Sequence, residues 1–373
     1  MACDHFKPVI LPLSELLDRR VLDRYPVLAE FGESMGQTPL VAVPGPAGGG
    51  RVFAKCEWLN PTGTVKDRTA FGFVYDIVKD LDPQEVCNVH LLECTGGNLA
   101  FALNRLCAPL GITCTFVSVE GYLADQEIDA LQQDGHEILF VSKTLGFEGC
   151  LNRGGELAAQ HPDWIFLHQH ENRANLEVHR RFTGGEMVRQ LAAMDRVPSA
   201  WAASVGTAGC LMGVYEALRR PFPEVGLYVV SPAEKPYGGQ LPYAPDVPSY
   251  SGAGGYTCGR KQPFVERDED QVTGRIEISF EEAMLHVATF ERATGVVIGG
   301  SSSANWLAAY RIARELGPEG VVCTMFPSAS HTAIERQRIE RFSDLEVVRG
   351  LAELDLRSDD YPDLGRAHQA SRL

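Results

Sequence analysis

The feature of this sequence that most constrains its fold is an alternation of short apolar runs with helical patterns, joined by short turns. Apolar runs at 51–58 and 89–92 each precede a helical pattern, at 67–79 and 99–107 respectively. Strands that alternate with helices form parallel sheets whose faces the helices cover. The sequence therefore predicts an α/β protein. Further strand-like runs lie at 137–141, 225–231 and 320–326, and further helical patterns at 120–133, 154–161 and 211–218.

The size and charge of the chain limit what it can be. Its 373 residues, 45% of them apolar, can bury a full hydrophobic core, which we expect to be divided between two domains. The formal net charge is −15, from 34 basic and 49 acidic residues. Binding to nucleic acid or to an anionic membrane depends on basic surface, so neither is expected as a partner.

The cysteines and histidines form no metal-binding pattern. Ten cysteines are scattered without a Cys-x-x-Cys pair, which indicates a reduced, buried set in a cytoplasmic protein and no metal site. Cys210 is singled out because a helix N-terminus lowers the pKa of a thiol. His168 and His170 alternate on a run that reads as a strand from 164 to 168, and ordinary packing or hydrogen bonding is expected for them. No stretch has the length of a membrane-spanning helix, and residues 1–6 carry no signal-peptide pattern.

A lysine lies in a tight loop between a strand and a helix. Lys66 belongs to the run Asn-Pro-Thr-Gly-Thr-Val-Lys-Asp-Arg at 60–68, where proline and glycine indicate a sharp turn. A cation is disfavoured at a helix N-terminus, so this placement requires a reason. We predict that Lys66 reaches a bound ligand from the edge of a sheet.

Two glycine-rich turns supply further candidate ligand sites. The turn at 202–210 follows a run of small residues and opens a helical pattern, so its backbone N–H groups and the helix dipole suit a phosphate. The turn at 93–98 lies between a strand-like run and a helical pattern, and its Thr, Asn and backbone N–H groups suit a carboxylate or a ring oxygen.

Six segments follow one another in the order and spacing of the motifs of a known family. They are Gly-Gln-Thr-Pro-Leu at 36–40, the lysine loop at 60–68, Thr-Gly-Gly-Asn-Leu at 95–99, Gln169 with Asn-Arg-Ala-Asn at 172–175 and Thr-Gly-Gly-Glu at 183–186, Gly-Thr-Ala-Gly-Cys at 206–210, and Gly-Gly-Ser-Ser-Ser-Ala-Asn at 299–305. Together they resemble the cysteine synthase and cystathionine β-synthase family of fold type II pyridoxal-phosphate enzymes. The resemblance extends over about residues 36–327.

The resemblance implies a fold like that of the tryptophan synthase β subunit, with two open, twisted parallel-sheet domains and pyridoxal 5'-phosphate in the cleft between them. By this likeness, residues 1–37 and 61–172 form an N-terminal domain that carries the substrate loop. Residues 38–60 and 173–347 form a C-terminal, phosphate-binding domain. We expect residues 348–373 to be a loosely ordered tail. A homodimer is also implied, because an N-terminal segment in this family often crosses to the partner subunit.

The resemblance also assigns roles to the motif residues. Lys66 would form a Schiff base with the cofactor and, once released by the substrate amine, would act as the base that removes the α-proton. Asn98 would hydrogen-bond the ring hydroxyl oxygen of the cofactor, and Ser301 its pyridine nitrogen. The cofactor phosphate would be held by Gly206, Thr207, Ala208, Gly209 and Cys210. The substrate carboxylate would be oriented by Thr95, Gly96, Gly97, Asn98 and Gln169.

The implied reaction is β-replacement on an O-activated L-serine, either O-acetylserine or O-phosphoserine, through a bound aminoacrylate. Sulfide or another small nucleophile would then give cysteine or a related β-substituted alanine. A neutral serine at position 301 does not enforce a protonated pyridine ring, which favours expulsion of a β-leaving group over transamination.

Three other functions are compatible with the sequence. One is a diaminopropionate-type synthase of specialised metabolism, with ammonia or an amine as the nucleophile. Another is a threonine synthase or dehydratase type of reaction, because threonine synthases carry an Asn-Pro-Thr-Gly like that at 60–63. The third is a scaffold without catalysis, against which the intact Lys66, Asn98 and Ser301 argue.

Departures from the family pattern argue against plain housekeeping cysteine synthesis. Ala208 replaces a glycine of the phosphate loop, and Cys210 replaces a threonine whose hydroxyl binds phosphate. Gly96 replaces a hydroxyl residue of the carboxylate loop. The segment 231–275 also differs, and it holds a basic residue, Arg260, that could bind a phosphate leaving group. A solvated basic pair with the neighbouring lysine is the favoured alternative for Arg260.

Overall fold

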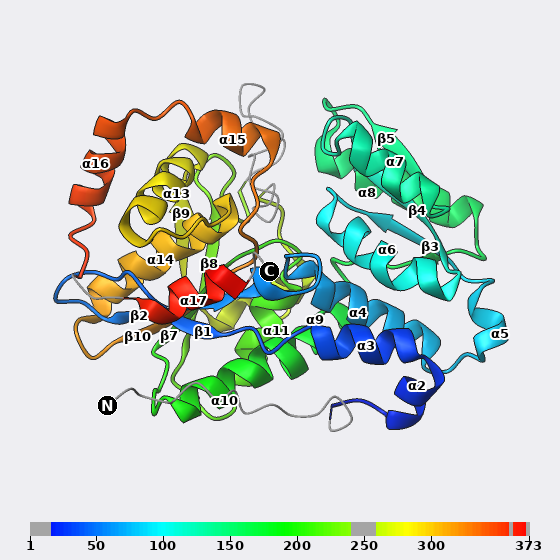
Figure 1. Cartoon of the computed structure of the whole chain (residues 1–373), viewed down its shortest axis with the longest axis horizontal. Helices are drawn as coiled ribbons and strands as arrows, with labels where there is room; N and C mark the ends of the chain where they lie inside the picture. Colours follow the sequence, from blue (N-terminus) through cyan, green and yellow to red (C-terminus); the bar gives the residue numbers. More distant parts are fainter. Residues whose placement is uncertain (1–15, 240–258, 358–360, 371–373) are drawn as a thin grey trace.

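The computed structural model describes residues 16–239, 259–357 and 361–370, which form two lobes with a β-sheet in each (Figure 1). The larger lobe lies on the left of Figure 1 and the smaller lobe on the right. Helices cover both faces of each sheet, and all neighbouring strands but one pair are parallel. The predicted two-domain α/β fold with parallel sheets is therefore confirmed.

Six strands form the sheet of the larger lobe, in the order β1-β2-β10-β7-β8-β9. Only β1 runs antiparallel to its neighbour, β2. All residues of the central strand β10 are buried, as expected for a parallel sheet with helices on both faces. The strands are β1 (Leu40–Val43), β2 (Arg51–Cys56), β7 (Ala200–Ser204), β8 (Gly226–Pro232), β9 (Val272–Ile278) and β10 (Val321–Phe326).

Alternate residues of β10 face two different helical layers, because side chains alternate across a strand. Val322 and Phe326 pack with α13 and α14 on one face of the sheet. Cys323 and Met325 pack with α10 and α11 on the other. These covering helices are α10 (Gly185–Ala193), α11 (Gly209–Leu218), α13 (Phe280–Thr294) and α14 (Gly300–Leu316).

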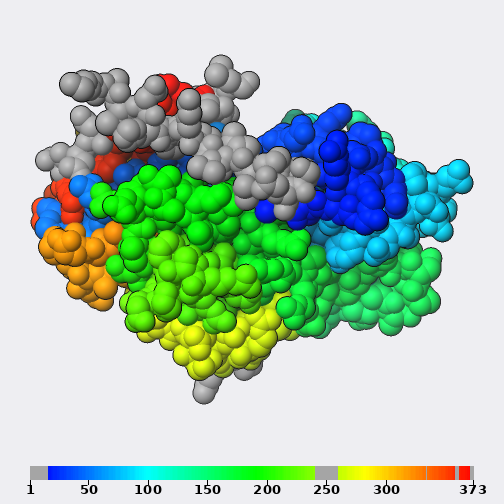
Figure 2. All heavy atoms as spheres, turned by 90° about the horizontal axis from the view of Figure 1, so that it is seen from below, coloured from blue at the N-terminus to red at the C-terminus, as the bar shows by residue number. Residues whose placement is uncertain are grey.

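Four parallel strands form the sheet of the smaller lobe, in the order β5-β4-β3-β6. They are β3 (His90–Cys94), β4 (Thr113–Val119), β5 (Glu137–Val141) and β6 (Ile165–Phe166). One face packs with α3 (Pro26–Ser34), α4 (Lys66–Val78) and α6 (Asn98–Leu110), and the other with α8 (Gly146–Gln160). Figure 2 shows α2 (Arg19–Arg24) and α3, in dark blue, on the surface of the smaller lobe.

Shorter elements complete the described chain. They are α5 (Pro83–Val86), α7 (Asp125–Gln133), α9 (Arg173–Val178), α12 (Pro263–Glu266), α15 (Ala333–Ile339), α16 (Asp344–Glu353), α17 (Pro362–Ala370), 3-10 turns at Glu57–Leu59 and Glu269–Gln271, and a π-helical segment at His179–Gly184. In the described ranges, no helix combines the length and the apolar composition that a membrane crossing requires.

The strands of the two sheets fall within the ranges predicted for the two domains. The sheet of the larger lobe takes its strands from 38–60 and 173–347, and that of the smaller lobe from 61–172. The domain boundaries themselves stay a prediction.

The prediction of a loosely ordered tail from residue 348 onward is wrong for the described part. This stretch holds the end of α16 and all of α17. Leu364 and Ala367 of α17 are buried in the core of the larger lobe, and α17 lies against β1 (Figure 1). The polar composition hid this packing, because a short amphipathic helix needs few apolar residues to cover a sheet edge.

Two local predictions are also corrected. The strand expected at 164–168 ends at Phe166, because His168 adopts a left-handed conformation with φ of 50°. His168 and His170 therefore do not alternate on a strand. The helix expected at 120–133 begins only at Asp125, after Gly121 with φ of 78°.

Candidate active site

The loops that follow the parallel strands gather at the carboxyl edges of the two sheets, where α/β proteins bind ligands. The lysine loop after β2 is joined to the segment after β10, since the Val65 N–H donates to the Pro327 carbonyl oxygen at 2.9 Å. The amide of Ser204, at the end of β7, donates to Asn305 Oδ1 of α14 at 2.7 Å. From the smaller lobe, Gln169 accepts a hydrogen bond of 3.1 Å from Lys66 Nζ.

The residues around Lys66 fix the shape of its loop. The backbone N–H and the hydroxyl of Thr62 each donate to the Asp67 carboxylate at 2.7 Å. Gly63 has φ of 80°, a conformation that favours glycine. The Asn60 side chain donates to the Glu57 carboxylate at 2.7 Å. Asn60, Gly63 and Asp67 therefore shape the turn that presents Lys66 at the first position of α4.

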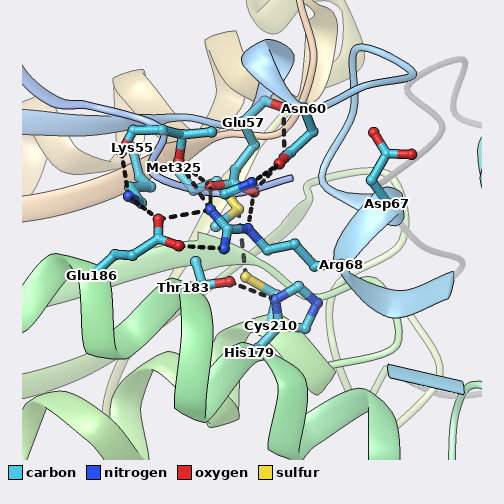
Figure 3. Close-up of polar contacts among 12 residues, drawn as sticks. Lys55, Glu57, Asn60, Asp67, Arg68, His179, Thr183, Glu186, Cys210 and Met325 are labelled. Carbon is cyan, nitrogen blue, oxygen red and sulfur yellow. Dashed lines mark hydrogen bonds and ion pairs between the residues drawn. The ribbon is translucent and has the colours of Figure 1, made fainter. Parts of the chain in front are cut away.

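A buried cluster of charges lies beneath this loop and joins the two lobes (Figure 3). Arg68 of α4 binds Glu57 through Nε at 2.6 Å and Glu186 of α10 through Nη1 at 2.8 Å. Lys55 Nζ lies 2.7 Å from Glu186 Oε2. Burial raises the pKa of Glu186, but the Arg68 and Lys55 cations outweigh it and lower this pKa to about 2. The Glu186 carboxylate is therefore ionised, and its ion pair with Arg68 fixes α4, with Lys66 at its start, against the larger lobe.

Lys66 itself is half-buried and has an altered ionisation. Burial lowers the pKa of its amine, and a negative charge on Glu93 or Cys210 would oppose this shift. A lysine with a lowered pKa is a better nucleophile and base near neutral pH. Lys66 can therefore supply a neutral amine to a carbonyl compound.

The predicted phosphate loop lies at the N-terminus of α11. Thr207 Oγ1 accepts hydrogen bonds from Asn175 Nδ2 at 2.8 Å and from the Gly209 N–H at 3.3 Å. A Cβ atom at Gly209 would lie 2.4 Å from the Asn175 amide nitrogen, so only glycine fits there. Ala208 has φ of 65°, a left-handed conformation that is strained for a residue other than glycine. The glycine-lined turn and the helix N-terminus fit a phosphate group.

The other residues with predicted roles lie at the same sheet edges. Ser301 is the second residue of α14, and Asn98 is the first residue of α6. Thr95 Oγ1 accepts from the Gly97 N–H at 3.2 Å, and Gly97 has φ of 135°, which favours glycine. Gly96 is exposed in the same turn. Direct hydrogen bonds join Lys66, Gln169, Asn175 and Thr207, and the assignments of Asn98 and Ser301 stay predictions.

The prediction that Cys210 has a lowered pKa is wrong. Burial raises the pKa of the Cys210 thiol. The sulfur of Cys210 lies 3.4 Å from the sulfur of Met325 (Figure 3).

The Arg260 side chain is paired with a carboxylate, unlike an arginine that is held ready to bind a phosphate. Its Nη1 lies 3.3 Å from the Glu148 carboxylate of α8, in the smaller lobe, and Lys261 pairs with Glu269 at 2.9 Å. Residues 240–258, within the divergent segment, lie outside the described residues. Where the chain is described, each of these two cations has a carboxylate partner.

Sequence reasoning did not identify Glu93, whereas the hydrogen bonding expected for His170 is confirmed. Glu93 is a buried acid in an apolar strand, just before the turn at 95–98. An acid at this position of the sequence was the signal that could have identified it. His170 hydrogen-bonds Gln262 at 2.8 Å, whereas His168 lies 3.4 Å from the Glu171 carboxylate. Burial lowers the pKa of His170 to about 4. Among the described residues, no three His, Cys, Asp or Glu side chains group into a metal site.

Comparison with known proteins identifies the family. A family model described as a pyridoxal-phosphate dependent enzyme matches residues 33–328. A probable cysteine synthase of Bacillus subtilis is 30% identical over 305 residues, covering 80% of this chain and 94% of that protein. Cysteine synthase B of Campylobacter jejuni is 28% identical over 300 residues, covering 79% of this chain and 93% of that protein.

Solved structures share the fold. O-acetylserine sulfhydrylase isoform 3 of Entamoeba histolytica superimposes with a TM-score of 0.74 at 23% identity, covering 88% of this chain and 95% of that chain. A hydrogen sulfide-producing enzyme of Fusobacterium nucleatum gives 0.70 at 22% identity, covering 90% and 97%. These likenesses confirm the fold, and the family match confirms the cofactor predicted from the motifs. The chain belongs to the pyridoxal-phosphate-dependent enzymes of fold type II, and it is a cysteine synthase-like enzyme with pyridoxal 5'-phosphate as its cofactor.

Proposed function

We propose that this enzyme catalyses β-replacement on an O-activated L-serine, with sulfide or another small nucleophile. The observation that carries the proposal is the environment of Lys66. Its amine has a lowered pKa and donates a hydrogen bond to Gln169. The Gln169 carbonyl oxygen accepts from Asn175, which also donates to Thr207 of the predicted phosphate loop. The 30% identity to a probable cysteine synthase supports the same reaction class.

The residues present fit the cofactor. Lys66 would hold it covalently, and the backbone of Gly206, Thr207, Ala208, Gly209 and Cys210 would hold its phosphate. Asn98 would bind the ring hydroxyl oxygen and Ser301 the pyridine nitrogen. When bound, the cofactor supplies the electron sink that a carbanion at the substrate Cα requires. Lys66, once released, removes the α-proton, and the turn at 95–98 orients the substrate carboxylate.

Among the activated serines, we favour O-acetylserine over O-phosphoserine. A phosphate leaving group would require a cation close to the substrate. Arg260, the candidate for this role, is instead paired with Glu148. A neutral acetyl ester has no such requirement. The homodimer and the cytoplasmic location remain proposals by likeness, and light scattering on a size-exclusion column tests the first of them.

The test is a visible-absorbance titration of the purified holoenzyme with O-acetylserine, O-phosphoserine, L-serine and L-threonine. We expect O-acetylserine to change the cofactor spectrum and to release acetate. A response to O-phosphoserine alone would reverse the choice of leaving group. A response to threonine alone would favour a threonine synthase or dehydratase reaction.

A second titration identifies the nucleophile. Sulfide and ammonia are added to the enzyme after O-acetylserine, and the amino acids formed are separated. Cysteine would support the cysteine synthase reaction, and 2,3-diaminopropionate the alternative in specialised metabolism. We expect Lys66→Ala to abolish both products. Lys79→Ala changes a partly exposed lysine paired with Asp76, and we expect it to retain them.

A further inference from the structure

Glu335 is a buried carboxylate in the first turn of α15. Only 3% of its surface is exposed. Its Oε2 accepts from the Thr332 N–H at 2.6 Å, and the Thr332 hydroxyl accepts from the Glu335 N–H at 3.2 Å. A threonine and a glutamate that are paired in this way form a capping box at a helix N-terminus. This local role accounts for one of the two carboxylate oxygens of Glu335.

Glutamates in the same position of other helices are not buried. Glu85 and Glu346 complete capping boxes at the starts of α5 and α16, and both are exposed. Hydrogen bonds to Ser343 lower the pKa of Glu346, whereas burial raises the pKa of Glu335 to about 7. A capping box therefore does not require a buried carboxylate, and the burial of Glu335 has another cause.

That cause is a contact with Gly300, the first residue of α14. A Cβ atom at Gly300 would collide with Glu335 Oε1 and with Met284 Cε, so only glycine leaves room for the carboxylate. The Gly300 N–H donates to this carboxylate. The first N–H groups of a helix lack partners within the helix, and a carboxylate beside them is stabilising. Glu335 therefore supplies an acceptor to α14 as well as to α15.

The residues next to Ser301 are held by the segment that leads to Glu335. The Ser328 carbonyl oxygen accepts from the Gly299 N–H at 3.0 Å and from the Ser302 hydroxyl at 2.7 Å. A helix fixes the backbone of consecutive residues relative to one another. These contacts, together with that of Glu335, therefore determine where the Ser301 side chain lies.

We propose that Glu335 is a positioning residue, which holds the first turn of α14 so that the Ser301 hydroxyl meets the pyridine nitrogen of the cofactor. The proposal rests on the role given to Ser301 in the proposed function. It is measured on cofactor binding, without any substrate. An enzyme that binds the cofactor in this way and turns over no serine ester would contradict the proposed reaction and leave the role of Glu335 standing.

The experiment compares the binding of two cofactors to cofactor-free protein, at about pH 8, above the raised pKa of Glu335. One is pyridoxal 5'-phosphate, and the other is its analogue in which a C–H group replaces the pyridine nitrogen. The ratio of the two dissociation constants reports the contact at the nitrogen. Ser301→Ala gives the baseline, because it retains any difference in aldehyde reactivity. We expect the wild type to prefer the natural cofactor about fivefold more than Ser301→Ala does, as one hydrogen bond would allow.

Glu335→Gln should reduce this preference to that of Ser301→Ala. A glutamine amide has one acceptor oxygen, so the N–H of either Gly300 or Thr332 would face an NH2 group. The double variant should show no further change, because the two residues act as one unit. The matched control is Glu346→Gln, which alters the exposed capping box of α16 and should keep the wild-type preference.

A wild-type preference in Glu335→Gln would overturn the proposal, even if both cofactors bound more weakly, as a purely structural role would cause. If this variant fails to fold, Glu335→Asp provides the same test, because its side chain is too short to reach both N–H groups. Equal preferences in the wild type and Ser301→Ala would show that Ser301 does not bind the nitrogen, and would overturn both that assignment and the role of Glu335.

Discussion

Replacing Arg68 by methionine removes the cation shared by two buried carboxylates. Arg68 is fully buried and donates to both oxygens of Glu57 and of Glu186 at 2.6–2.9 Å. After the change, Glu186 keeps Lys55 as its partner. Glu57 keeps only neutral donors among these contacts, the Thr38 hydroxyl and the Asn60 amide. The main cost is therefore an uncompensated charge on Glu57.

We expect Arg68→Met to lower the free energy of unfolding by about 3–5 kcal/mol, the cost of breaking a buried ion pair from one side. The matched control is Arg153→Met, because Arg153 forms an exposed pair with Glu156 at 2.9 Å. Such surface pairs contribute about 0–1 kcal/mol. Adding Glu57→Gln to Arg68→Met should recover stability, since it removes the unpaired charge.

The assay is urea unfolding of the holoenzyme and the variants, followed by tryptophan fluorescence at several pH values. The pKa of Glu186 falls from 4.5 to about 2 on folding, so its contribution is complete above pH 4.5 and is lost as the pH falls toward 2. The wild type should therefore lose more stability over this pH range than Arg68→Met does. If Arg68→Met costs no more than Arg153→Met, the buried cluster does not hold the lobes together.

Three further changes test separate parts of the structure. Ala208→Gly should stabilise the protein by about 1 kcal/mol by relieving the left-handed alanine, measured by urea unfolding; a loss of stability would contradict the strain. Leu364→Ala should lower the free energy of unfolding by about 2–4 kcal/mol in the same assay, because the side chain is fully buried. A negligible change would support the prediction of a loosely ordered tail. Arg260→Gln should lower the free energy of unfolding by less than about 1 kcal/mol, because it removes only the surface ion pair with Glu148. It should leave the preference between O-acetylserine and O-phosphoserine unchanged in a steady-state assay, and a selective loss of O-phosphoserine turnover would assign Arg260 to the substrate.

The parts of the fold that depend on neighbouring residues could be predicted from the sequence. β5 has the predicted bounds, and α4 begins within one residue of its predicted start. The turn around Gly63 is closed by Thr62 and Asp67, residues only five positions apart, which is why the lysine loop could be recognised in the sequence. Strand–helix alternation then determined the class of fold.

The parts that depend on distant residues could not be predicted. Arg68 and Glu186 are 118 positions apart, and Glu93 and Gln169 are 76 positions apart, so neither contact leaves a local pattern. The ionisation of Cys210 depends on how many atoms surround the thiol, which the helix-start pattern does not reveal. The tail was misjudged for the same reason, since Leu364 gains its stabilisation from a distant core.

Lys66 is the lysine that we propose to carry the cofactor. The most direct measurement is reduction of the holoenzyme with borohydride, followed by proteolysis and mass spectrometry of the lysine-containing peptides. We predict a pyridoxyl group on Lys66, and no modified peptide in Lys66→Ala, with Lys79→Ala modified like the wild type. A pyridoxyl group on another lysine, or no modified lysine in a protein that binds the cofactor, would contradict the account.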